Sequence, residues 1–237
     1  MQPTPIAIVN RSTVLTDVVI RAVIRALQKQ VSSDLAPAWC VDARLCFVGS
    51  GAPIPAGAWA ITISDNTDDP AGDLGYHSSD ANGPYAKVFA KTTMDDNQEW
   101  SAVISHELLE MLINPLGSLA AFVPSDNTGL IGRYYDLEVC DPVYPQDQCY
   151  KIDNVLVSDF VFPAWFAPWI TDAGPGRLTP QVDKADRVQA ALQLAPGAIV
   201  AVSDSKKNTI NGPAPMGPAA PLARLPSTLS HLKASTA

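Results

Sequence analysis

The segment from Asn97 to Ile113 combines a strongly apolar surface with ionisable side chains at its centre. Its spacing predicts a helix that ends before Pro115. Most of its sides are apolar, through Trp100, Val103, Ile104, Leu108, Leu109, Met111 and Leu112. A helix that is apolar nearly all round is expected to be buried. His106, Glu107 and Glu110 nevertheless lie within it, and buried ionisable groups are costly unless they are paired or bind a metal.

The spacing of these ionisable residues points to metal chemistry. His106 and Glu110 are four residues apart, so their side chains share one face of the helix. Zincins hold their ion with two ligands one turn apart in the pattern HExxH, whereas this chain reads HExxE, with Glu110 in place of the second histidine. The position of Glu107 is that of a general base beside a metal-bound water.

Carboxylates must complete any such site, because the chain has only three histidines and His231 lies far away in the tail. The best donor is a predicted strand from Arg133 to Cys140. Alternation along that strand would direct Asp136 and Glu138 to one side. We predict His106, Glu110 and Glu138 as metal ligands, with Asp141 or Asp136 as an outer partner or substitute.

The predicted ligand set also bears on the identity of the metal. One histidine with two carboxylates is a harder set than that of an ordinary zinc site, so manganese, iron or calcium are alternatives to zinc, which is expected first. His77 is expected in a polar loop between Asp65 and Gly83, as a hydrogen-bond donor at the edge of the cleft. The alternative without metal is a hydrogen-bonded His–Glu pair, with Glu110 paired to Arg133.

The remaining pattern predicts an α+β fold with a mixed sheet and a few helices. Strands are expected at 6–9, 44–48, 59–64 and 85–92, with a hairpin at 150–160 whose tip is Asp153-Asn154. A helix is expected from Thr13 to Leu35, with Ser12 as its N-cap. Its apolar face is predicted to consist of Val14, Val18, Val19, Val23, Leu27 and Val31.

The charge is unevenly distributed between the body and the tail. No acidic residue follows Asp204, whereas Lys206, Lys207, Arg224 and Lys233 do. Subtracting these four positive charges from the net charge of −8 leaves about −12 on the rest. We therefore expect one domain over 1–203 and a Pro-rich basic C-terminal arm over 204–237 that docks on a neighbouring subunit. The acidic body argues against direct nucleic-acid binding.

The sequence also bears on membrane insertion and export. No apolar run approaches the roughly 20 residues that a membrane helix requires. The N-terminus, Met1-Gln2-Pro3-Thr4-Pro5, lacks a basic region followed by an apolar run. The sequence therefore predicts a protein that is neither transmembrane nor exported through the Sec pathway.

Several segments in order resemble a family of phage, prophage and bacterial proteins related to zincin-type metallopeptidases. They are Leu74-Gly75-Tyr76-His77, Gly83-Pro84-Tyr85-Ala86-Lys87-Val88-Phe89, Trp100-Ser101, Ser105-His106-Glu107-Leu108-Leu109-Glu110-Met111, Glu138-Val139-Cys140-Asp141-Pro142, Val157-Ser158-Asp159-Phe160 and Pro163-Ala164-Trp165-Phe166. The resemblance covers about residues 74 to 166. It implies a zincin-like fold, with an edge strand over the active helix and a ligand segment downstream. It also implies metal binding at His106, Glu110 and Glu138, and a base at Glu107.

Two functions follow from the residues and the resemblance together. The first is a structural protein of a phage virion, with a zincin-like metal-binding scaffold and arms that contact neighbouring subunits, found in the virion or the host cytoplasm. The second is an active metal-dependent hydrolase or peptidase with Glu107 as general base. A third, weaker reading is a binding module that exposes Trp165, Phe166 and Trp169 as an aromatic patch.

Overall fold

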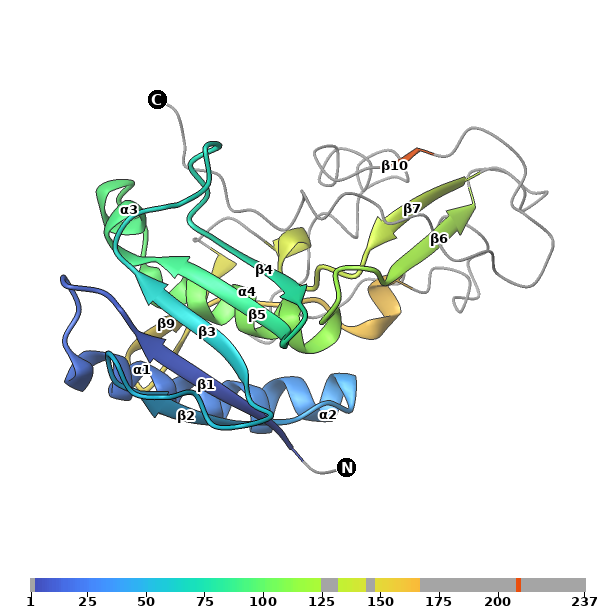
Figure 1. The fold of residues 1–237 in the computed structure, drawn as a ribbon. Helices are drawn as coiled ribbons and strands as arrows, with labels where there is room; N and C mark the ends of the chain where they lie inside the picture. The colour runs from blue at the N-terminus through green and yellow to red at the C-terminus, as the bar shows by residue number, and fades with distance from the viewer. Residues whose placement is uncertain (1–2, 125–131, 144–147, 167–207, 210–237) are drawn as a thin grey trace.

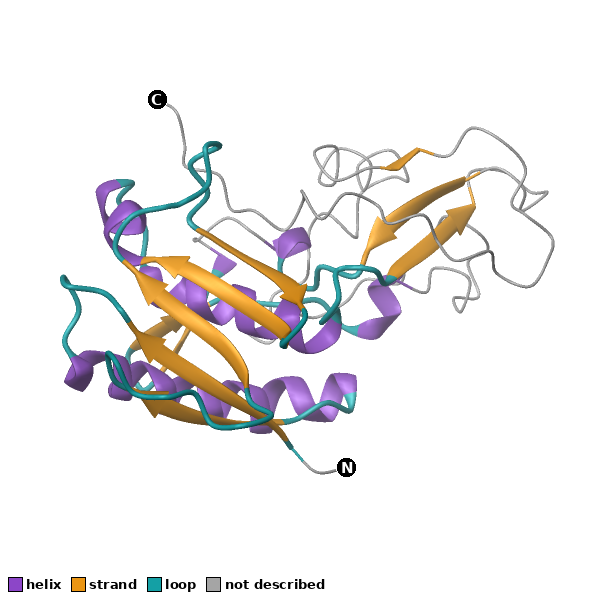
Figure 2. Cartoon of the chain, viewed as in Figure 1, coloured by secondary structure: helices purple, strands orange, loops and turns teal. Residues whose placement is uncertain are grey.

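A five-stranded sheet forms the centre of the protein. The computed structural model describes residues 3–124, 132–143, 148–166 and 208–209. The strands lie in the order β2 (Ala43–Val48), β1 (Thr4–Asn10), β3 (Trp59–Ser64), β5 (Gly83–Phe89) and β4 (Gly75–Asp80) (Figure 1). The first four are parallel, and β4 is an antiparallel edge strand beside β5. The strands come in runs, β2 to β5 and β6 (Ala120–Pro124) to β7 (Gly132–Asp136), with helices before and between these runs (Figure 2), and the predicted α+β class with a mixed sheet is confirmed.

One face of this sheet carries the main core. Strand β1 alternates, so Ile6 and Ile8 enter the large hydrophobic cluster, whereas Ala7 belongs to a smaller cluster on the opposite face. Leu27 and Leu108, from two different helices, belong to the same large cluster as Ile6 and Ile8. Both helices therefore pack on one face of the sheet.

The first helical region differs from the prediction at its beginning and along its exposed face. Helix α1 spans Asp17–Lys29 and is followed by a π-helical segment, η1 (Gln30–Leu35), and by α2 (Ala36–Trp39). Thr16 is the N-cap, and its hydroxyl accepts from the Val19 amide at 3.4 Å. The predicted cap Ser12 instead donates to Asp65. The predicted apolar face was wrong at its start, because Val18 is 76% exposed.

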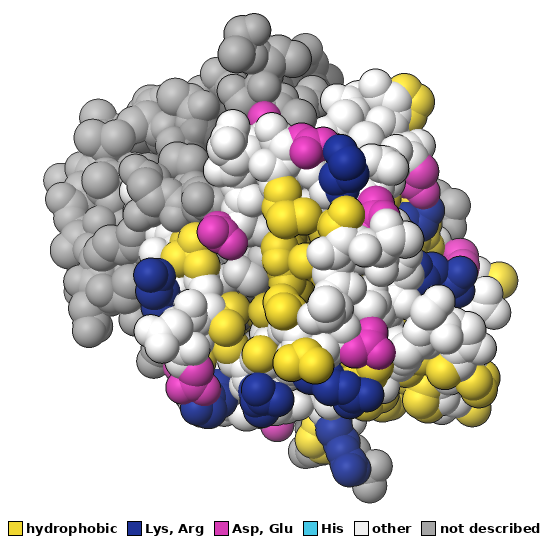
Figure 3. Space-filling view, turned by 90° about the vertical axis from the view of Figure 1, so that its left-hand side faces the viewer, with side chains coloured by type: hydrophobic (Ala, Val, Ile, Leu, Met, Phe, Trp, Pro, Cys, Tyr) yellow, Lys and Arg dark blue, Asp and Glu magenta, His cyan; other side chains and the backbone are white. Residues whose placement is uncertain are grey.

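Exposed apolar side chains are a visible feature of one face of the molecule. Val14, Val18 and Val19 precede or begin α1 and are exposed, as is Met94 of α3 (Ala90–Asp95). In the space-filling view, apolar side chains gather in a stripe above a row of Lys and Arg side chains (Figure 3).

The buried face of α1 is formed by Ile20, Val23, Ile24, Ala26 and Leu27.

The predicted metal-site helix is present and fully buried. Helix α4 spans Trp100–Ile113, and every one of its 14 residues is buried. It packs against β5, β4 and β9. The strand predicted for 85–92 ends at Phe89, after which α3 begins. The predicted helix start at Asn97 was three residues early, because Asn97 has a left-handed φ of 56°.

The segment that supplies the downstream carboxylates does not form the long strand that was predicted. Strand β7 (Gly132–Asp136) pairs with β6 (Ala120–Pro124) and with β10 (Asn208–Thr209). The chain then leaves the ladder, and Glu138, Val139 and Cys140 are all buried in succession. The alternation argument was therefore wrong beyond Asp136, since an alternating strand would have turned Val139 away from its neighbours.

The later hairpin is confirmed. Strands β8 (Tyr150–Ile152) and β9 (Val155–Val157) are joined by Asp153 and Asn154, both with positive φ. A short 3-10 turn, η2 (Asp141–Val143), precedes it, and another, η4 (Pro163–Phe166), follows. Phe166 is 8% exposed and packs edge-on to Trp39, so this ring contributes to the core and not to an exposed patch. Trp169 lies outside the described residues.

The predicted C-terminal arm lies largely outside the described residues. Within 204–237 only Asn208–Thr209 are described, and they pair with β7. The arm and its neighbouring subunit stay predictions. The described part of the chain contains no helix with the length and apolar character that crossing a bilayer demands.

Candidate metal centre

Three parts of the fold bring ionisable side chains to one buried cluster. Helix α4 contributes His106, Glu107 and Glu110, whose residues are 1%, 0% and 0% exposed. Strand β4 contributes His77, and the segment after β7 contributes Glu138 to Asp141. The sequence reasoning predicted the burial of the three residues on α4. We call this group the 106–110 cluster: His77, His106, Glu107, Glu110, Glu138 and Asp141.

His106 lies between two carboxylates. Its Nε2 is 3.1 Å from Glu110 Oε2 and 3.3 Å from Asp141 Oδ1. A single imidazole N–H can satisfy only one of these oxygens. Ligands bonded to one tetrahedral cation at about 2.0–2.2 Å lie roughly 3.2–3.6 Å from each other, so each of the two separations is close to that of a pair of ligands on a common ion.

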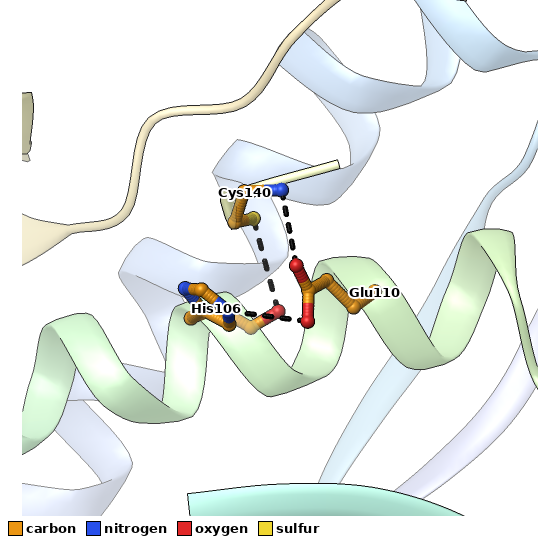
Figure 4. Close-up of side chains that lie close together, drawn as sticks. All are labelled: His106, Glu110 and Cys140. Carbon is orange, nitrogen blue, oxygen red and sulfur yellow. Dashed lines mark hydrogen bonds and ion pairs between the residues drawn. The ribbon is translucent and has the colours of Figure 1, made fainter. Parts of the chain in front are cut away.

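Each carboxylate oxygen of Glu110 contacts a different partner. Its Oε1 accepts the amide N–H of Cys140 at 3.2 Å, and its Oε2 faces His106. The Cys140 thiol lies 3.8 Å from the carbonyl of His106 (Figure 4). Ligand atoms of His106, Glu110 and Cys140 lie within 4.8 Å of one another, so these three residues could hold a metal ion.

His77 is placed differently from the prediction. It lies in strand β4 and not in a loop, and it is 3% exposed. Its Nδ1 is 3.6 Å from Glu107 Oε2 and 4.0 Å from Glu110 Oε2. His77, Glu107 and Glu110 form a second group with ligand atoms within 4.8 Å. Residues of a strand alternate between faces, and this brings His77 and Gly75 to the side of α4.

The downstream carboxylates take separate places in the cluster. Asp141, predicted as an outer partner or substitute, is the one that faces His106. Glu138 Oε2 lies 3.8 Å from His77 Nε2, and its Oε1 is 3.5 Å from the Asn114 side-chain amide. Asp136 ends β7, and none of Asp136, Glu138 and Asp141 belongs to either metal-compatible group. The role of Glu138 as a direct ligand of the His106 site stays a prediction.

Burial and mutual charge shift the proton affinities of the cluster. Burial alone would lower the pKa of His77, but Glu138, Glu107 and Glu110 outweigh it and raise the pKa to about 9. Glu110 and Asp141 likewise overcome burial at His106 and raise its pKa. Burial raises the pKa of Glu107 and of the Cys140 thiol. A divalent cation would relieve the same concentration of negative charge.

Two neighbouring features that the sequence reasoning missed hold the helix in place. Ser105 Oγ donates to Gln30 Oε1 at 2.7 Å and accepts the amide of Ser158 at 2.9 Å. A Cβ atom at Gly75 would lie 2.8 Å from Val103 Cγ1 and 3.1 Å from Glu107 Cγ. The sequence signal for the first feature was a serine, Ser105, in an otherwise apolar helix. The signal for the second was a glycine, Gly75, beside strand-forming residues.

Comparison of the chain with protein-family models, with curated proteins and with solved structures gives no match.

Proposed function

We propose that this chain is a zincin-like metal-binding protein in which His106 and Glu110, together with Cys140 or Asp141, hold a divalent cation that stabilises the fold. The observation that carries the proposal is the position of His106 Nε2, 3.1 Å from one carboxylate oxygen and 3.3 Å from another. The near-complete burial of His106 and Glu110 favours a structural role over a site open to large substrates. Such a cation would join α4 to the segment that follows β7.

Metal analysis of the purified protein tests this proposal directly. We expect bound metal, zinc first and manganese, iron or calcium as alternatives, and a melting temperature that falls when a strong chelator is added. His106→Ala should lose that metal. His231→Ala is the matched control, because it removes a histidine that the proposed ligand set does not use, and it should leave the metal content unchanged. Equal metal contents in the two variants would contradict the assignment.

The structural role is proposed to operate in a phage particle. Support comes from the resemblance of residues 74–166 to phage and prophage proteins, and from the basic, Pro-rich composition after Asp204. Truncation after Ser205 should abolish assembly with neighbouring subunits while the body keeps its melting temperature. Normal particles from the truncated chain would count against the arm.

A second candidate function is metal-dependent hydrolysis, and Glu107 favours it. Glu107 directly follows the first proposed ligand, is wholly buried, and accepts no hydrogen bond within 3.5 Å from the described residues. The bound cation would supply activation of a water molecule, and Glu107 would accept the proton of that water. The side chain of Asp141 is 21% exposed and marks the solvent side of the cluster.

Substitution of the proposed base separates the two functions. Glu107→Gln should keep the metal bound at His106 and lose cleavage of a casein or peptide substrate, whereas Glu99→Gln, at an exposed position before α4, should keep both. Full cleavage activity in Glu107→Gln would rule out the base assignment. A wild-type protein without any cleavage but with bound metal supports the structural role.

A further inference from the structure

We propose that the 106–110 cluster binds two divalent cations, with Glu110 shared between them. This inference rests on the proposed metal binding at His106 and extends it to a second ion. The first cation would take His106 and Glu110, together with Cys140 or Asp141. The second would take His77, Glu107 and Glu110, which form a separate group of ligand atoms within 4.8 Å of one another.

The second set has the components of a metal site and is not only a group of acids. His77 Nδ1 faces Glu107 Oε2 at 3.6 Å and Glu110 Oε2 at 4.0 Å. Its other nitrogen, Nε2, faces Glu138 Oε2 at 3.8 Å. Histidines that bind a metal through one nitrogen usually present the other to a carboxylate, which orients the ring. In this arrangement Glu138 is the orienting carboxylate of His77.

Glu107 gives independent support for a ligand at this place. Its side chain is fully buried, and neither of its carboxylate oxygens accepts a hydrogen bond within 3.5 Å from the described residues. A buried carboxylate left in that condition is strongly disfavoured. A cation between Glu107 and His77 would bind both side chains and replace their long 3.6 Å contact with two direct metal bonds.

Glu110 lies where a bridging carboxylate would be required. Its Oε2 is 3.1 Å from His106 Nε2 and 4.0 Å from His77 Nδ1, so one oxygen faces both proposed ions. Carboxylates commonly join paired metals that lie about 3.5–4 Å apart. The other oxygen is held by the Cys140 amide, which keeps the carboxylate in place when the ions are exchanged.

The charge of the cluster fits two cations better than one. Glu107, Glu110, Glu138 and Asp141 contribute four negative charges when ionised, and histidines that bind metal are neutral. With one divalent ion at His106, a protonated His77 would offset only part of the remaining negative charge, whereas two ions balance all four carboxylates. The ion pairs of Lys29, Lys87 and Lys91 are formed elsewhere, with Asp153, Asp68 and Asp95.

Metal stoichiometry of the full-length protein tests the inference. The protein is stripped with chelator, loaded with Mn²⁺, passed through gel filtration and analysed for manganese per chain. We expect two ions in the wild type and in His231→Ala, and one in His77→Ala and in Glu107→Gln. One ion per wild-type chain would overturn the second site and leave the proposed function intact. No ion at all would overturn both.

Electron paramagnetic resonance of the same samples provides a readout that does not depend on how well the variants fold. Two Mn²⁺ ions that share a carboxylate interact magnetically, so the loaded wild type should give a broadened, coupled spectrum. The six-line spectrum of an isolated Mn²⁺ ion in the loaded wild type would contradict the shared Glu110. Appearance of that six-line spectrum in folded His77→Ala supports it.

Discussion

Ser105 and Gln30 share a buried hydrogen bond of 2.7 Å, one residue before the proposed ligand His106. The bond joins helix α4 to the π-helical segment η1. The Gln30 side-chain amide also donates to the carbonyl of Ser158 at 2.7 Å, and the Ser158 amide donates back to Ser105 at 2.9 Å. These three residues hold α4 against η1 and the segment after β9, one residue before His106 of the 106–110 cluster.

The first prediction concerns this network. Ser105→Ala should lower the free energy of unfolding by about 1–3 kcal/mol, because the Ser158 amide and the Gln30 oxygen would lose a buried partner. Urea denaturation of the metal-free protein measures the change. Ser33→Ala, at an exposed position of η1, is the control and should stay within about 0.5 kcal/mol of the wild type. Equal losses in the two variants would show that the network contributes no special stability.

Gly75 sets how closely the edge strand β4 approaches α4. A methyl group at this position would meet Val103 Cγ1 at 2.8 Å, and Glu107 at 3.1 Å. Gly75→Ala should therefore cost about 1–3 kcal/mol through overpacking and should weaken metal binding, because His77 and Glu107 would be pushed apart. Calorimetric unfolding and metal titration measure the two effects.

Gly49 provides a matched control for that substitution. A Cβ at Gly49 would make only an ordinary contact of 3.6 Å with the Phe47 ring. Gly49→Ala should consequently leave both stability and metal binding close to the wild type. A Gly75→Ala protein that behaves like Gly49→Ala would contradict the close approach of β4 to Glu107.

Much of the scaffold could be predicted because its signals are local. Strand β3 coincides with the predicted run from Trp59 to Ser64, and the turn at Asp153-Asn154 lies where the sequence places it. The burial of α4 followed from its composition alone, since no side of the helix is polar enough to face water. His106 and Glu110 met as predicted because their spacing is fixed by the helix itself.

The partners of the helix were harder to predict because they depend on the path of the chain. Glu138 and Asp141 belong to an irregular segment, in which no fixed period relates side chains to faces. The turn η2 places Asp141 against His106, although alternation along a strand favoured Glu138. His77 was assigned to a loop because Gly, Asp and Ser surround it, yet pairing with β5 draws this segment into the sheet. Tertiary pairing outweighed local propensity there.

Asp65 provides a prediction for the dependence of stability on pH. The hydroxyls of Ser12 and Thr13 hydrogen-bond to its carboxylate and lower its pKa from 3.8. A depressed folded-state pKa stabilises the protein above the unfolded value, and the stabilisation is lost as the pH falls through the folded value. Asp65→Asn should thus melt below the wild type at pH 7, with a difference that shrinks below about pH 4.

Melting curves of the two proteins between pH 7 and the acid limit of folding measure this difference. The site is largely open to solvent, so the effect at neutral pH should be on the order of 1 kcal/mol or less. Asp80→Asn, at the exposed end of β4, is the control for the loss of one negative charge. A difference between Asp65→Asn and wild type that persists unchanged in acid would exclude the ionised carboxylate as its cause.

The turn between β8 and β9 gives the last prediction. Asp153 and Asn154 have φ values of 49° and 66°, the left-handed pair that a tight type I′ hairpin requires. Asn154→Val should lower the free energy of unfolding by about 1–2 kcal/mol, because a β-branched residue is strained in this region, whereas Asn154→Gly should equal or exceed the wild type. Thermal denaturation ranks the three proteins, and Asp153 keeps its ion pair with Lys29 in all of them. Since β9 packs against α4, a Val variant as stable as the Gly variant would mean that the hairpin adds little to the support of α4.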